Sequence, residues 1–120
     1  MSKVILFQGD SVTDCGRSRE NVFNGGLGSG YPTLIGARIL ADHLGEGYQI
    51  YNRGISGNRV VDLYARWKCD AIVLRPDIIS ILIGVNDTWH EYSHHRRCTA
   101  PSRAWPSGVR QPSASLPPSP

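Results

Sequence analysis

The amino-acid sequence predicts an α/β fold built on a parallel sheet. Three short segments that favour β-structure, at 4–7, 48–51 and 78–83, alternate with two segments whose apolar residues recur at helical spacing. Strands that alternate with helices are typical of parallel sheets. The segment at 78–83 is apolar almost throughout, as expected of a parallel strand covered on both faces. The 120 residues leave room for one small domain.

The helices are predicted from spacing and from the residues that flank them. The first is expected to begin near Tyr31, because Pro32 suits a first helical turn, and to stop at Gly45 and Gly47. The second is expected after the turn-rich loop at 52–58. The apolar positions are Leu34, Ile35, Ile39, Leu40 and Leu44 in the first helix, and Val60, Val61, Leu63, Tyr64 and Trp67 in the second.

The composition divides the chain near Tyr92. Residues 1–92 hold nine Lys/Arg and ten Asp/Glu, a net charge of −1, whereas residues 93–120 hold four Arg and no acid, a net charge of +4. Six of the eight prolines also lie in 93–120, which predicts a disordered tail. A frameshift or truncation near Tyr92 would explain this composition, and an evolved tail is the alternative. Four arginines are too sparse to indicate a nucleic-acid partner.

Several classes of protein and site are not indicated. No apolar stretch approaches the roughly 20 residues that span a bilayer, so no membrane partner is expected. The N-terminus lacks the features of a signal peptide, which predicts a cytoplasmic location. The three cysteines, Cys15, Cys69 and Cys98, form no CxxC pair and no cluster with histidines, so we expect reduced thiols and no metal site.

A polar motif follows each predicted strand. The motifs begin at Gly9, Asn52 and Gly84, and ligands of parallel sheets bind outside the carboxyl ends of the strands. We therefore expect the three motifs to converge on one active site. Each motif alone has a simpler interpretation: a capped turn at Gly9-Asp-Ser11, a turn glycine at Gly54, and a helix cap at Asn86-Asp87.

Together the motifs resemble blocks I, II and III of the SGNH, or GDSL-type, serine hydrolases. The matching stretches are Gly9-Asp-Ser-Val-Thr-Asp-Cys-Gly-Arg17, Asn52-Arg-Gly-Ile-Ser-Gly-Asn58 and Gly84-Val-Asn-Asp87. The resemblance implies that Ser11 is the nucleophile, for which Cys15 is a weaker candidate. It also implies an oxyanion hole made by the N–H groups of Ser11 and Gly54 and the side-chain amide of Asn86. Asp10, Asp14 and Asp87 are expected to support these residues.

The resemblance further implies a three-layer α/β/α, flavodoxin-like fold whose family sheet has five strands. Only about three are present here, so the strand at 78–83 is expected to become an exposed apolar edge and the chain to be poorly soluble or partly ordered. Over residues 3–92 the chain most resembles bacterial intracellular acetyl esterases that act on acetylated xylo-oligosaccharides. This implies a small acetylated carbohydrate as substrate and no cofactor. Trp67 and Trp89 are candidates for either a sugar site or core packing.

The family's fourth catalytic element is an Asp-x-x-His near the end of a chain about twice this long. Its histidine is the general base and its aspartate orients that histidine. We expect this element to be missing here. His43 and His90 are expected at the surface, and His94 and His95 lie where the resemblance has ended.

Three functions remain in order of preference. The first is a GDSL-type serine esterase whose catalysis is impaired by the missing base. The second is a non-catalytic fragment that binds acetylated carbohydrate or regulates another protein. The third, a generic nucleotide-binding domain, is opposed by the lack of GxGxxG and Walker-type motifs.

Overall fold

The computed structural model describes residues 3–20 and 22–98, with side chains described as far as Ser93. It contains one parallel sheet with the strand order β2-β1-β3. The strands are β1 (Val4–Gly9), β2 (Gln49–Asn52) and β3 (Ile78–Leu82). This arrangement confirms the predicted fold class and the three predicted strands.

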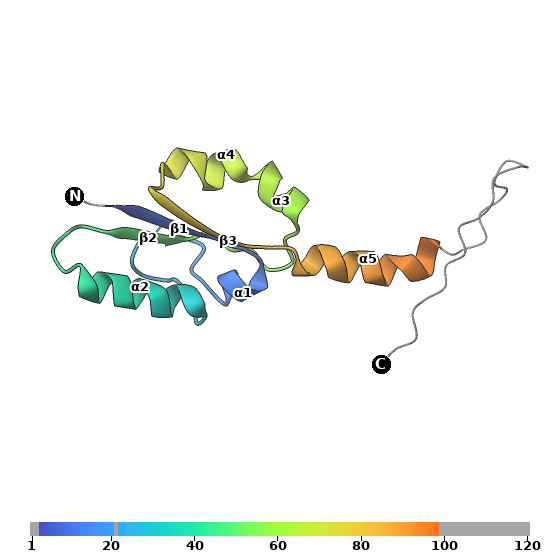
Figure 1. Cartoon of the computed structure of the whole chain (residues 1–120), viewed down its shortest axis with the longest axis horizontal. Coiled ribbons are helices and arrows are strands. Elements are labelled where there is room, and N and C mark those ends of the chain that lie inside the picture. The colour runs from blue at the N-terminus through green and yellow to red at the C-terminus, as the bar shows by residue number, and fades with distance from the viewer. Residues whose placement is uncertain (1–2, 21, 99–120) are drawn as a thin grey trace, which may run out of the picture.

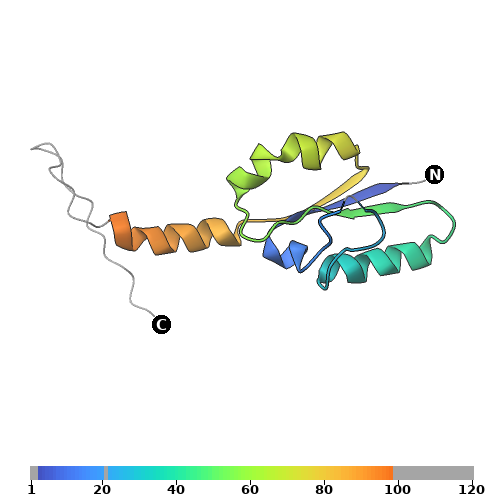
Figure 2. The ribbon, with the colours of Figure 1, turned by 180° about the vertical axis from the view of Figure 1, so that it is seen from behind.

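Helices cover both faces of the sheet. In Figures 1 and 2, α1 and α2 lie on one face and α3 and α4 on the other, which gives three layers. The helices are α1 (Ser11–Asp14), α2 (Tyr31–Asp42), α3 (Val60–Ala65), α4 (Trp67–Asp70), the short 3-10 helix η1 (Ile72–Leu74) and α5 (Val85–Cys98). The second predicted helix is therefore divided in two, because the backbone of Arg66 leaves the helical region at φ −102° and ψ 6°. None of the described helices is long and apolar enough to cross a membrane.

The expected boundary at Ser93 falls inside a helix. Helix α5 continues without interruption from Val85 to Cys98 and extends away from the sheet (Figure 1). The rest of the predicted tail, from position 99 to position 120, lies outside the described residues.

The main core lies between the sheet and α2. Ile5, Phe7 and Ile50 are buried there with Leu27 and Tyr48. The rings of Phe7 and Tyr31 meet edge to face, with centroids 5.6 Å apart. A Cβ on Gly36 would lie 2.9 Å from a methyl group of Leu27, so glycine lets α2 approach the core closely.

The predicted apolar positions of the helices are only partly buried. In α2, Ile39 and Leu40 pack on the core, but Leu34 is 74% exposed, and Leu44, which lies just beyond the end of the helix, is 82% exposed. In α3, Leu63 is buried, whereas the remaining predicted positions Val60, Val61 and Tyr64 are exposed. Of the ten predicted apolar positions, six are therefore exposed among the described residues: Leu34, Ile35, Leu44, Val60, Val61 and Tyr64.

Candidate active site

Ser11 lies at the turn between the central strand and α1. Strand β1 ends at Gly9, and the next residue, Asp10, caps α1 by accepting the N–H of Val12 at 3.0 Å. Asp10 is buried, whereas Ser11 is the first residue of the helix and is exposed. A Cβ at Gly9 would come within 2.3 Å of the Leu82 carbonyl oxygen, so only glycine fits here. The turn therefore presents the Ser11 hydroxyl at the surface on a firmly packed support.

The loop after β2 runs beside this turn. The N–H of Arg53 donates to the carbonyl of Phe7 at 2.9 Å, and the N–H of Ile55 donates to that of Gly9 at 3.1 Å. Parallel pairing between β1 and the segment after β2 thus continues beyond the end of β2, with every second residue of that segment bonded. The predicted convergence of the first two motifs is confirmed.

Asp14 fastens α1 to the same loop. Its Oδ2 accepts the N–H and hydroxyl of Ser56 at 2.9 and 3.2 Å and the guanidinium of Arg19 at 2.6 Å. Burial raises the pKa of this carboxyl, but the bonds from Ser56 and Arg19 outweigh it and leave the pKa below its ordinary value of 3.8. Asp14 is therefore ionised, and its supporting role is structural.

Gly54 is buried between α1 and the loop. Its N–H donates to Asn52 Oδ1 at 2.9 Å, and the amide of Asn52 donates in turn to the carbonyls of Thr13 and Leu27 at 2.7 and 2.8 Å. A Cβ on Gly54 would lie 2.5 Å from the Asp14 nitrogen. The close approach requires glycine, but the N–H predicted for the oxyanion hole already has a partner.

A second glycine of the loop, Gly57, has a different environment. It adopts φ 84°, and the space where its Cβ would stand is open. Within the part of the chain that the structure describes, its N–H has no hydrogen-bond partner. Sequence reasoning did not single out Gly57. The signal was present in the spacing, because Gly57 is the second glycine of Gly54-Ile-Ser-Gly57.

The motif after β3 joins the same site. The side-chain amide of Asn86 donates to the carbonyl of Asn58 at 3.0 Å. The Asp87 carboxylate accepts the N–H of Val60, the first residue of α3, at 3.0 Å. All three predicted motifs therefore meet at one edge of the sheet, and a primary amide such as that of Asn86 carries a second N–H for a ligand.

Arg66 ties these loops to the sheet, a role that sequence reasoning missed. Its guanidinium donates to Asn58 Oδ1 at 2.7 Å, to Gln8 Oε1 and Asp70 Oδ2 at 2.9 Å, and to the Arg53 carbonyl at 2.8 Å. The planar, many-donor guanidinium suits such a junction. Nothing in the spacing around Arg66 indicates these partners, which lie in segments distant in the sequence.

The histidines require one correction. The Asp-x-x-His element was expected to be missing, but Asp87 and His90 do have that spacing. Their surroundings differ from those of a base and its orienting aspartate. Asp87 binds the backbone of Val60, and exposed His90 lies close enough to Asp62 to help lower the pKa of that carboxyl, after the larger effect of Arg59. His43 follows α2 and stacks on Tyr48, as a partly exposed residue.

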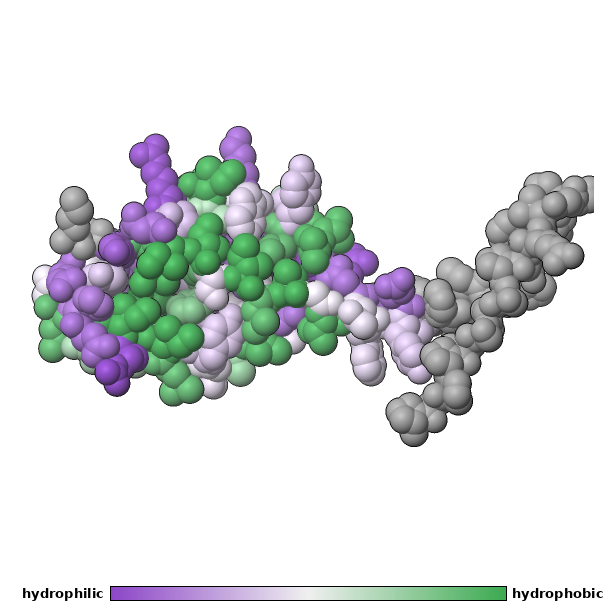
Figure 3. Space-filling view, in the orientation of Figure 1, coloured by the Kyte–Doolittle hydropathy of each residue, from purple (hydrophilic) through white to green (hydrophobic). Residues whose placement is uncertain are grey.

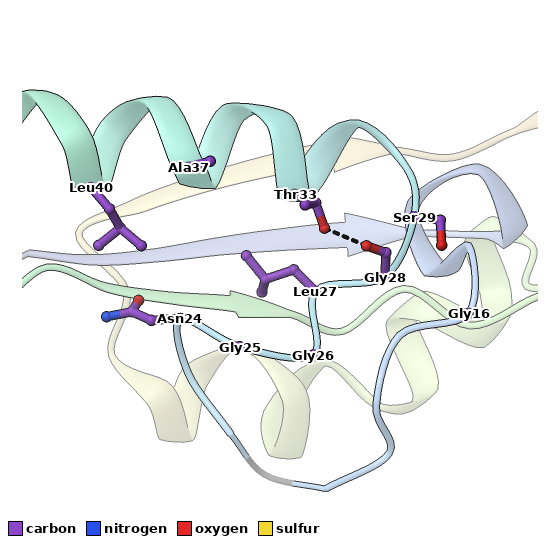
Figure 4. Close-up of a pocket in the computed structure, with 10 residues that line it drawn as sticks. All are labelled: Gly16, Asn24, Gly25, Gly26, Leu27, Gly28, Ser29, Thr33, Ala37 and Leu40. Atoms are coloured by element: carbon purple, nitrogen blue, oxygen red, sulfur yellow. Dashed lines mark hydrogen bonds between the residues drawn. The ribbon is translucent and has the colours of Figure 1, made fainter.

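One hollow in the described region lies away from Ser11. It is a groove of about 480 Å³ between α2 and the loop at 24–29 (Figure 4). Leu27 and Leu40 line it, and the Thr33 hydroxyl bonds to the Gly28 carbonyl at its edge. Neither Ser11 nor Asn86 contributes to it.

Trp89, a candidate for either a sugar site or core packing, is 71% exposed, so it is not part of a core within the described residues.

No group of three or more His, Cys, Asp or Glu side chains in the described part of the chain could hold a metal ion. Cys15 and Cys69 are free and exposed.

Comparisons with known proteins agree with the geometry. Residues 7–110 match the GDSL-like lipase/acylhydrolase family. The chain is 48% identical over 91 residues to an acetylxylan esterase of Geobacillus stearothermophilus, a stretch that covers 73% of this chain and 41% of that relative.

Solved structures give the same result. A GDSL-like lipase from Parabacteroides merdae matches with a TM-score of 0.73 and 50% identity, over 78% of this chain and 44% of that one. The Geobacillus acetylxylan esterase matches with a TM-score of 0.69 and 46% identity, over 75% and 42%. The chain thus spans about two fifths of the length of these relatives. Its sequence and its fold show that it belongs to the GDSL-like lipase/acylhydrolase family of ester hydrolases.

Proposed function

We propose that this chain forms the nucleophile-bearing part of a serine esterase, with Ser11 as the nucleophile. The observation that carries the proposal is the exposed position of Ser11 at the end of the sheet where the three motif loops gather. The Ser11 oxygen would attack the ester carbonyl while a base takes its proton, and the collapsing intermediate would release the alcohol. Water would then release the acid from the acyl-serine by the same steps.

Three donors are proposed for the oxyanion that forms in both steps. The Ser11 N–H lies in the first turn of α1, where backbone N–H groups have no partner within the helix. The Asn86 amide supplies the second donor. The third comes from the loop after β2, and Gly57 is better disposed than Gly54, because the Gly54 N–H would first have to leave Asn52. One such donor contributes about 2.7–4 kcal/mol to transition-state stabilisation.

The substrate class is proposed from the relatives. The Geobacillus enzyme is an acetylxylan esterase, and it is also described as an acetyl-xylooligosaccharide esterase. We propose that this chain's site accepts small acetylated carbohydrates. Ester hydrolysis through serine requires no cofactor.

The general base is proposed to come from a part of the domain that the described residues do not contain. In the Geobacillus enzyme, substitutions of a serine, an aspartate and a histidine are all described as catalytic mutants, and the last two lie three positions apart. Without such a base, this chain alone should retain at most a weak activity, on the order of 10³–10⁴ above the uncatalysed rate.

The test is a hybrid enzyme. Residues 3–92 of this chain replace the matched stretch of the Geobacillus esterase, and acetate release is measured on p-nitrophenyl acetate and acetylated xylo-oligosaccharide. Ser11→Ala should abolish turnover, whereas Cys15→Ala, at an exposed residue four positions away, should retain it. A hybrid that keeps its activity after Ser11→Ala would remove Ser11 from the mechanism. So would a hybrid that loses its activity with Cys15→Ala but not with Ser11→Ala.

A second candidate is a non-catalytic binder of acetylated carbohydrate. It is favoured by the lack of a histidine beside Ser11 among the described residues. Calorimetric titration of the full chain with acetylated xylo-oligosaccharide distinguishes the two: saturable binding without acetate release, in the chain and in the hybrid, supports the binder.

A further inference from the structure

We infer that Asn58 and Arg66 position the side-chain amide of Asn86 for the oxyanion. The inference rests on the proposed function, in which that amide is one of the donors. Neither Asn58 nor Arg66 is assigned a contact with the substrate. Both act through hydrogen bonds that lead from the central strand to Asn86, and these three residues are called the positioning chain below.

The last bond of the positioning chain fixes the direction of the Asn86 amide. Nδ2 of Asn86 donates to the backbone carbonyl of Asn58 at 3.0 Å. A carbonyl oxygen can only accept, so the nitrogen end of the amide faces Asn58. With one N–H held there, the second N–H of the planar amide has a fixed direction, as a preorganised donor requires. The place of the Asn58 carbonyl therefore decides where that second N–H points.

Asn58 is itself held on two sides. Its N–H donates to the carbonyl of Ile55 at 3.1 Å, which closes a turn with Gly57 at the third position. The φ of 84° at Gly57 matches the third residue of a type II turn. On the other side, Oδ1 of Asn58 accepts the Nε–H of Arg66 at 2.7 Å. Asn58 thus joins Asn86 through its main chain and Arg66 through its side chain.

Arg66 is anchored on the central strand. Its guanidinium donates to Oε1 of Gln8 at 2.9 Å and to the Gly9 carbonyl at 3.3 Å. Gln8 is fully buried in β1, and its own amide donates to the last carbonyl of α4 at 3.0 Å. Gly9 stands two residues before Ser11. One guanidinium therefore connects the backbone that leads into the Ser11 turn with the loop after β2.

The charge of Arg66 is withdrawn from solvent. Figure 3 shows hydrophobic residues across the middle of the molecule and hydrophilic ones mostly around the rim of the view. The Arg38 side chain is 80% exposed, whereas that of Arg66 is 15% exposed. A guanidinium so far from water needs partners for its donors, because an unsatisfied buried polar group is costly. Its bonds are for this reason hard to rearrange, as a positioning residue requires.

A purely structural role for Asn58 and Arg66 makes a different prediction. If they only stabilise the fold, their loss lowers the fraction of folded enzyme and leaves each folded molecule equally active. If they position Asn86, their loss lowers kcat in the folded enzyme, while KM changes little. A structural role also acts whether Asn86 is present or not, whereas positioning requires Asn86.

The experiment uses the hybrid enzyme with residues 3–92 of this chain and p-nitrophenyl acetate. Asn58→Ala removes Oδ1 and keeps the carbonyl, and it should lower kcat by about tenfold or more, part of the roughly 10²–10³-fold cost of losing an oxyanion donor. Asn58→Asp restores an acceptor for Arg66 and should recover kcat to within about threefold. Circular dichroism verifies folding, and Asn58→Ser, whose hydroxyl is one bond shorter, replaces Asn58→Ala if that variant does not fold.

The matched control is Asn24→Ala, which removes the same side-chain atoms beside β2. Oδ1 of Asn24 accepts the N–H of Ile50 at 2.8 Å, and Nδ2 donates to the Tyr48 carbonyl at 2.7 Å. This variant should lose stability but keep the kcat of the folded hybrid within about twofold. A fall in kcat equal to that of Asn58→Ala would overturn the inference.

A double-mutant cycle with Asn86→Ala decides whether Asn58 acts through Asn86. Asn58→Ala should lower kcat by about tenfold or more when Asn86 is present and by less than about twofold when it is absent. An equal effect in both backgrounds, or a KM that rises while kcat is unchanged, would overturn the inference.

Ser11→Ala is measured alongside the cycle. Activity that survives Ser11→Ala removes the proposed function and this inference together. Activity that requires Ser11 and Asn86 but tolerates Asn58→Ala overturns the inference alone.

Discussion

Asn52 Oδ1 accepts the N–H of Gly54 at 2.9 Å, inside the loop that was expected to supply part of an oxyanion hole. The same Asn52 side chain binds the carbonyl of Thr13 in α1 and that of Leu27 in the glycine-rich segment. One buried amide thus connects three segments that are far apart in the sequence. The bond between Asn52 and Gly54 fixes the loop in place. It also occupies the Gly54 N–H, which was the predicted donor of the oxyanion hole.

The two glycines of this loop should respond differently to alanine. Gly54→Ala would force a Cβ to within 2.5 Å of the Asp14 nitrogen, so we expect a loss of about 1–3 kcal/mol in the free energy of unfolding. Gly57→Ala meets no atom within 4 Å and should cost only the strain of φ 84°, about 1–2 kcal/mol. Urea unfolding of the full chain, followed by circular dichroism, measures both.

Activity of the hybrid enzyme then separates packing from chemistry. If the Gly57 N–H binds the oxyanion, Gly57→Ala should displace this loop and lower the kcat of the hybrid even under conditions where the variant is fully folded. A kcat unchanged by Gly57→Ala but reduced by Gly54→Ala in a folded hybrid would return the role to Gly54.

The Asp14–Ser56 connection should make stability depend on pH in acid. The pKa of Asp14 is lowered in the folded chain, so the carboxylate stabilises the fold above its ordinary pKa of 3.8, and this contribution is lost as the pH falls toward the lower folded value. Asp14→Asn should lower the unfolding free energy by about 1–3 kcal/mol at pH 7 and flatten its decline below pH 4.

The control for this prediction is Asp42→Asn. Asp42 pairs with Arg38 on the exposed surface of α2, where an ion pair contributes about 0–1 kcal/mol. If Asp14→Asn and Asp42→Asn gave the same pH profile, Asp14 would not be the fastening residue.

Arg66 should resist even a conservative change. Lysine cannot reach Asn58, Gln8 and the Arg53 carbonyl with one planar group, so Arg66→Lys should cost about 1–3 kcal/mol. The matched change Arg38→Lys, at a side chain that is 80% exposed, should stay within about 0.5 kcal/mol. Equal midpoints of urea unfolding for the two variants would contradict the assigned role.

His90 should not be the catalytic base, despite its spacing from Asp87. The Asp87 carboxylate is bound to the Val60 N–H, and His90 acts on Asp62. We expect His90→Gln to leave the residual acetate release of the full chain unchanged within about twofold, because removal of a true base costs orders of magnitude. A drop comparable to that of Ser11→Ala would show that His90 serves Ser11.

Much of the fold could be predicted from local patterns. The strand segments, the first helix and the three motifs were located from hydrophobic spacing and glycine-containing turns, which depend on residues close in sequence. The convergence of the motifs also followed, because the carboxyl ends of parallel strands share one edge. The division of the second helix at Arg66 could not be predicted in this way, since the partners of that side chain come from β1 and the loop after β2.

By itself, the sequence determined the order of strands and helices along the chain, the family and the end of the sheet at which the three motifs gather. Only the tertiary structure decided which apolar residues are covered, that the Gly54 N–H is occupied, and that the Asp87 carboxylate binds the N–H of Val60. The physical reason is that burial and hydrogen bonding depend on segments distant in the sequence. Residues such as Leu34, Val61 and Ile81 have the spacing of core residues, but in the described structure no element packs over them.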